Sequence, residues 1–77
     1  MITKYYSNVF SSTAINEDGK FIRLSHGEGE VCISVGTDSN LFVLMGKLGT
    51  PCSKESFDAA LESCVGEMTN SLEAINI

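Results

Sequence analysis

The hydrophobic pattern of the chain changes its period about two-thirds of the way along. Before that point, apolar residues alternate or run together in four short segments, residues 4–12, 20–25, 30–35 and 41–46. Turn-forming sequences separate these segments, and the first turn, residues 16–19, contains the hairpin dipeptide Asp-Gly. Short strands joined by tight turns predict an antiparallel meander of four strands.

Residues 53–76 instead follow the period of an amphipathic helix. Their apolar positions fall in a band roughly 100° wide on one side of such a helix, and they are Phe57, Leu61, Cys64, Val65, Met68, Leu72 and Ile75. Ser53 is a suitable N-cap for this helix. The pattern predicts an α+β fold in a single domain over residues 1–77, with the sheet in 1–50 and the helix packed on one sheet face.

A single helix covers only one face of a sheet, whereas the predicted strands carry apolar residues on both sides. We expect Phe21, Phe42 and Leu44, together with Cys32 and aromatic residues of the first strand, to form an apolar patch on the face away from the helix. Such a patch is typical of an interface, and a second copy in a two-fold dimer is the commonest partner. A first strand that curls over the patch, or a sheet that bends into a half-barrel, would bury it instead.

The net charge of −5 argues against nucleic acid or an anionic membrane as a ligand. Residues 53–77 hold five acids and one lysine, whereas residues 1–52 hold five acids and four basic residues, so the excess charge lies on the helix. On a helical wheel, Glu55, Asp58, Glu62 and Glu73 share one side and Glu67 flanks them. This acidic side has two interpretations: a solvated face that maintains solubility, or a surface that binds a basic partner.

Residues with catalytic or metal-binding potential are few. His26, Cys32, Cys52 and Cys64 match the composition of a Cys₃His zinc site, but no two cysteines have the close spacing typical of such sites. Cys52 precedes the predicted helix, where a thiol pKa can be lowered, yet His26 is the one histidine available as its base. We therefore predict a protein without metal, cofactor or enzymatic activity.

The longest apolar run has five residues, 41–45, and the first residues lack the apolar region of a secretory signal, so we expect a cytoplasmic location without membrane contact. Our leading hypothesis is a small acidic binding module that blocks a basic nucleic-acid-binding surface on a larger protein. A concrete version is an anti-CRISPR-like inhibitor encoded by a phage or mobile element, acting in the host cytoplasm. The alternatives are an assembly protein that homodimerises through the apolar sheet face, and a thiol enzyme that uses Cys52.

Overall fold

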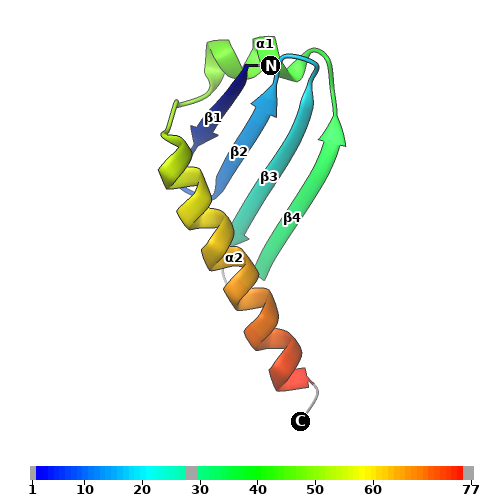
Figure 1. Cartoon of the computed structure of the whole chain (residues 1–77), viewed down its shortest axis with the longest axis vertical. Coiled ribbons are helices and arrows are strands. Elements are labelled where there is room, and N and C mark those ends of the chain that lie inside the picture. Colours follow the sequence, from blue (N-terminus) through cyan, green and yellow to red (C-terminus); the bar gives the residue numbers. More distant parts are fainter. Residues whose placement is uncertain (1, 28–29, 76–77) are drawn as a thin grey trace.

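Four antiparallel strands form one sheet, and a long C-terminal helix crosses one of its faces diagonally (Figure 1). The structure is a computed structural model that describes residues 2–27 and 30–75. The sheet has the order β1-β2-β3-β4, so the predicted α+β meander with a C-terminal helix is confirmed. The elements are β1 (Thr3–Ser7), β2 (Ser11–Asn16), β3 (Lys20–Gly27), β4 (Glu30–Thr37), α1 (Leu41–Leu48) and α2 (Lys54–Ile75). Residues 28–29, within a predicted turn, and the predicted helix end at 76 lie outside the described residues.

The segment 4–12, predicted as one strand, holds most of β1, a turn and the first two residues of β2, and the rest of β2 lies outside the predicted segments. The Asn8 side chain makes this turn, because its Oδ1 accepts hydrogen bonds of 2.8 Å from the backbone N–H groups of both Phe10 and Ser11. An asparagine that bonds to the backbone two or three residues ahead favours a reversal. The apolar side chains of Val9 and Phe10 therefore belong to a turn.

The segment 41–46, predicted as the fourth strand, is instead helix α1. Asp38 organises its start, because the Asp38 carbonyl accepts a hydrogen bond from Leu41 N–H and the Asp38 carboxylate accepts one from Asn40 N–H. Compared with the prediction, the first segment contributes to two strands instead of one, and residues 41–46 form helix α1 instead of a strand. The strand count of four is therefore correct, although two of the predicted strands are not.

Helix α1 lies on the face of the sheet opposite α2. In the antiparallel register, Lys4 and Tyr6 point to one face, whereas their neighbour Tyr5 points to the other face, toward α2. The Lys4 ammonium lies 5.4 Å from the centre of the Phe42 ring in α1, and the backbone after α1 packs against the ring of Tyr6. Each face thus receives one helix, and α1 covers one end of its face.

The hydrophobic core is small and divided between the two sides of the sheet. On the α2 side, Leu24 packs with Phe57 and Cys64, while Ile15 and Tyr6 are buried on the α1 side. The chain exposes 5435 Å² of surface. A folded monomer of 8.3 kDa is expected to expose about 4,600 Å², so this chain leaves roughly 800 Å² more surface in water than its mass requires.

Candidate functional site

The first half of α2 is fixed firmly to the sheet. Ser53 caps the helix as predicted, because its Oγ accepts a hydrogen bond of 3.0 Å from the N–H of Ser56. Phe57 is buried, and its ring centre lies 5.5 Å from that of Tyr5 in β1. Cys64, two turns farther along, is also buried against the sheet. The predicted apolar side of the helix therefore packs as expected over residues 57–64.

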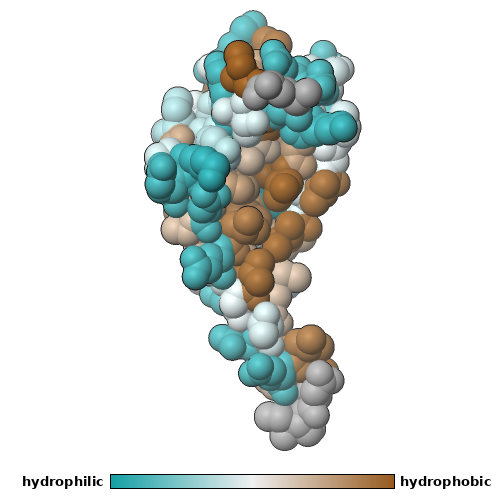
Figure 2. All heavy atoms as spheres, in the orientation of Figure 1, coloured by the Kyte–Doolittle hydropathy of each residue, from teal (hydrophilic) through white to brown (hydrophobic). Residues whose placement is uncertain are grey.

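The second half of α2 extends beyond the edge of the sheet, and its apolar side is exposed (Figure 1). Met68 is 49% exposed, Leu72 58% and Ile75 78%. The same face of the sheet is also incompletely covered, since Val35 is 76% exposed. We call these residues, with Ile22 and Val65, the α2-side apolar surface. Figure 2 shows hydrophobic residues gathered along this face beside and below α2.

The predicted apolar patch on the opposite face is built differently from the prediction, because two of its residues come from a helix rather than from a strand. Phe21 does lie on that face, over Gly36 and within 5.7 Å of the Arg23 guanidinium. Phe42 and Leu44 belong to α1 rather than to a strand, because the apolar run 41–46 folds as a helix. Exposed apolar side chains occur on both sides of the molecule, because Leu44 of α1 is 49% exposed and Leu48 is 76% exposed. A role of Phe21, Phe42 and Leu44 in dimerisation stays a prediction.

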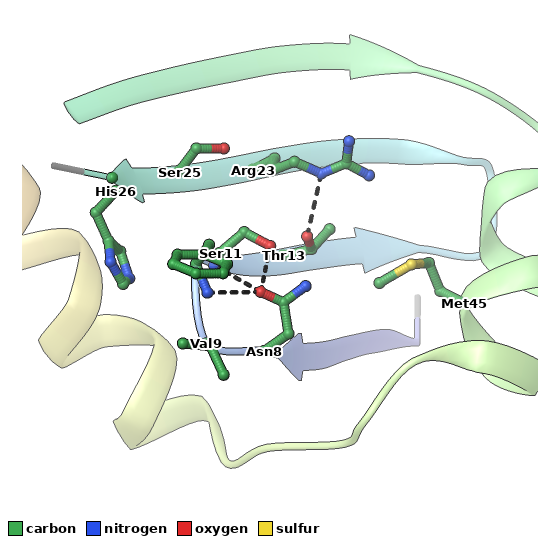
Figure 3. Close-up of a pocket in the computed structure, with 10 residues that line it drawn as sticks. Asn8, Val9, Ser11, Thr13, Arg23, Ser25, His26 and Met45 are labelled. Carbon is green, nitrogen blue, oxygen red and sulfur yellow. Dashed lines mark hydrogen bonds between the residues drawn. The ribbon is translucent and has the colours of Figure 1, made fainter. Parts of the chain in front are cut away.

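A groove of about 680 Å³ lies on the α1 side of the sheet, between the β1–β2 turn and Met45 of α1 (Figure 3). Its polar lining includes Ser11, Thr13, Arg23, Ser25 and His26. The Arg23 Nε donates a long hydrogen bond of 3.5 Å to the Thr13 hydroxyl. The groove offers hydrogen-bond donors and one cation to a ligand. Sequence analysis missed it, although alternate polar residues in β2 and β3 were a usable signal.

The acidic residues of α2 all lie in water. Glu55, Asp58, Glu62, Glu67 and Glu73 are exposed. Asp58 is paired, because the Lys54 ammonium donates a hydrogen bond of 2.9 Å to its Oδ2 across one helical turn. This hydrogen bond, and then the attraction between the two charges, raises the pKa of Lys54. The pair partly neutralises the Asp58 carboxylate, so the acidic side of α2 is not uniformly charged.

The three cysteines lie on separate elements. Cys32 is exposed in β4, Cys52 is half-buried before α2, and Cys64 is buried under α2. Cys52 is held by its backbone, whose N–H donates to the Tyr5 carbonyl at 2.9 Å. In the part of the chain that the structure describes, no three metal-binding side chains come together.

Neither described helix combines the length with the apolar content needed to cross a bilayer. Comparison with known proteins gives no match, because no protein-family model, curated protein sequence or solved structure is significantly similar to this chain.

Proposed function

We propose that the protein is a non-enzymatic binding module that acts by attaching to another protein through the α2-side apolar surface. The supporting observation is that the apolar side of α2 continues past Cys64, its last buried residue, through Met68, Leu72 and Ile75, which are about half to three-quarters exposed. A contiguous apolar surface of several hundred Å² on a small protein usually marks an interface. The second half of α2 can present this side to a groove on the partner, as amphipathic helices commonly do.

The charges on α2 suggest which residues would surround such a groove on the partner. Glu62 and Glu73 lie beside the apolar side of the helix, and both are exposed. A partner with basic residues around an apolar groove would complement both features. Blocking of a basic nucleic-acid-binding site, as by an anti-CRISPR-like inhibitor in a host cytoplasm, stays a proposal of this kind.

Replacement of Met68 by glutamate tests the apolar contact. Met68 is half-exposed, so Met68→Glu is expected to change the thermal unfolding midpoint only slightly. A carboxylate buried in an apolar interface should weaken partner binding about 100-fold or more. The measurement is quantitative capture from a lysate of the producing cell by the immobilised wild type and variant. Val9→Glu, in the exposed β1–β2 turn, is the control that should retain the captured protein.

Charge reversal at Glu62 tests the basic partner. Glu62→Lys, and more strongly the pair Asp58→Lys and Glu62→Lys, should lower affinity for the captured protein and flatten its dependence on salt. Asp18→Lys makes the same change of charge in the exposed β2–β3 turn and should have a much smaller effect. Equal affinities for Glu62→Lys and the wild type at low salt would exclude the charge-mimic version while leaving the apolar contact in place.

Self-association is the second candidate function, and one specific observation favours it. The chain exposes roughly 800 Å² beyond the expectation for its mass, which is about what each partner buries in an interface of standard size. An assembly protein of this type would use a second copy as its partner.

A further inference from the structure

We infer that a second copy of the chain pairs with the outer edge of β4, strand against strand, about a two-fold axis at Ile33. The product is a continuous antiparallel sheet in which two β4 strands lie at the centre. This proposal specifies the self-association described above, and it does not depend on the capture of any other protein.

The two edges of the sheet differ in how they are covered. The outer edge of β1 is paired, because Ser7 N–H donates to the Thr50 carbonyl and Cys52 N–H donates to the Tyr5 carbonyl, both at 2.9 Å. Across residues 2–27 and 30–75, no strand pairs with the outer edge of β4, which is the last strand of the sheet. β4 is eight residues long and contains neither proline nor lysine. Natural proteins usually protect such an edge with one of these residues, so β4 is suited to pairing with another strand.

The hydrogen bonds of β3 show which groups of β4 point outward. His26 N–H donates to the Phe10 carbonyl, on the side of β3 away from β4. The partner of His26 in β4 is Val31, so His26 and Val31 form a non-hydrogen-bonded pair. Because the two kinds of pair alternate along an antiparallel ladder, the backbone groups of Ile33 and Val35 also point away from β3. Every second residue from 31 to 35 therefore offers its N–H and C=O at the free edge.

A two-fold axis at Ile33 uses all of these groups at once. Ile33 then lies opposite its own copy, and Val31 lies opposite Val35 of the second copy, on both sides of the axis. The paired β-branched side chains lie on the α2 side of the sheet, where Val35 is otherwise largely in water. Burial of Val35 by its neighbour therefore accompanies the backbone pairing.

The charges of β4 permit this register. Glu30 is the single charged residue of the strand. In the proposed pairing Glu30 lies opposite Gly36 of the second copy, so the two carboxylates are separated by about six residues, or roughly 20 Å. That distance exceeds the screening length of about 8 Å at physiological salt, so the repulsion between them is weak. The acidic sides of both α2 helices stay in water.

Sedimentation velocity of the full chain over a range of concentrations tests the proposal. We expect a reversible dimer of twice 8.3 kDa. Val35→Pro removes an outward N–H at two symmetric positions, and should raise the dimer dissociation constant about 100-fold. Val35→Thr keeps the N–H and the β-branched shape, so its dissociation constant should stay within about fivefold of the wild type. Circular dichroism shows whether each variant keeps its strands.

Disulfide trapping tests the register through positions 32 and 34, which lie opposite each other across the proposed axis. In a Cys52→Ser and Cys64→Ala background, one protein keeps Cys32 and a second carries Cys32→Ser with Ser34→Cys. Oxidation of the mixture should link the two proteins rapidly, because directly opposed residues in this type of pair have Cα atoms about 4.5 Å apart. Each protein alone should link slowly, because its cysteines lie diagonally, about 7–8 Å apart.

A wild type that sediments as a monomer at its highest attainable concentration would overturn the proposal. Equal dimer dissociation constants for Val35→Pro and Val35→Thr would also overturn it. If Met68→Glu then abolished the dimer, the contact would be assigned to α2. Linkage in either single protein as fast as in the mixture would refute the axis at Ile33. Sedimentation of the purified chain requires no other protein, so its outcome is independent of the capture experiments.

Discussion

Shortening Leu24 to alanine is expected to lower the free energy of unfolding by about 3 kcal/mol. Leu24 is completely buried and packs with Phe57 and Cys64, the two points at which α2 is fixed to the sheet. The total stability expected for 77 residues is about 4–12 kcal/mol, so this loss is a large fraction of it. Urea denaturation followed by circular dichroism, at one protein concentration, gives the difference.

Leu72→Ala is the matched control, because it makes the same substitution at a leucine that is 58% exposed in the second half of α2. Its effect should be below about 0.5 kcal/mol, since it leaves no cavity and alanine is a good helix former. A loss at Leu72 as large as that at Leu24 would mean that the second half of α2 is buried in solution. Such a result would contradict the exposure on which the proposed function depends.

Replacement of Gly19 by alanine is expected to lower the free energy of unfolding by about 2–4 kcal/mol. Gly19 has a φ of +84°, a conformation that costs an alanine about 1–2 kcal/mol. A Cβ at this position would also overlap the backbone carbonyl of Asp38. The turn and the start of α1 are joined here, because Asp38 N–H donates to the Gly19 carbonyl at 2.9 Å.

Gly66→Ala is the comparison for Gly19→Ala, and the opposite sign is expected. Gly66 lies within α2, and a Cβ there would meet no atom within 4 Å. Alanine should therefore stabilise the helix by about 0.5–1 kcal/mol. Thermal or urea unfolding of the two variants side by side measures both effects. Equal and small effects would show that the Gly19 turn adopts another conformation in solution.

A dimer formed through β4 would affect the proposed binding activity. Both α2 helices then lie on the same face of one continuous sheet. The dimer therefore presents two copies of the α2-side apolar surface, except for Val35, which the pairing of the β4 strands buries. Two linked contacts increase the apparent affinity for a partner that itself has two sites. The Val35→Pro variant therefore offers a way to compare binding by one copy with binding by two.

The sequence predicted the elements whose pattern extended over many residues. The apolar period of residues 53–76 and the cap at Ser53 identified α2 nearly to its ends. The hairpin dipeptide at Gly19 placed the β2–β3 turn correctly, because few other residues adopt its φ. Sequence analysis failed on residues 41–46, where a five-residue apolar run fits a short helix as well as a strand. It also failed at Asn8, whose turn depends on one side-chain hydrogen-bonding pattern.

By itself, the sequence determined that a sheet and an amphipathic helix would pack together, and that the helix would carry the acidic charge. Only the tertiary structure decided which apolar residues are covered. Leu61 and Met68 occupy equivalent positions in the helical pattern, yet Leu61 packs on the core and Met68 is half in water. The reason is that periodicity records the direction of a side chain around the helix axis, whereas burial depends on where the sheet ends beneath it.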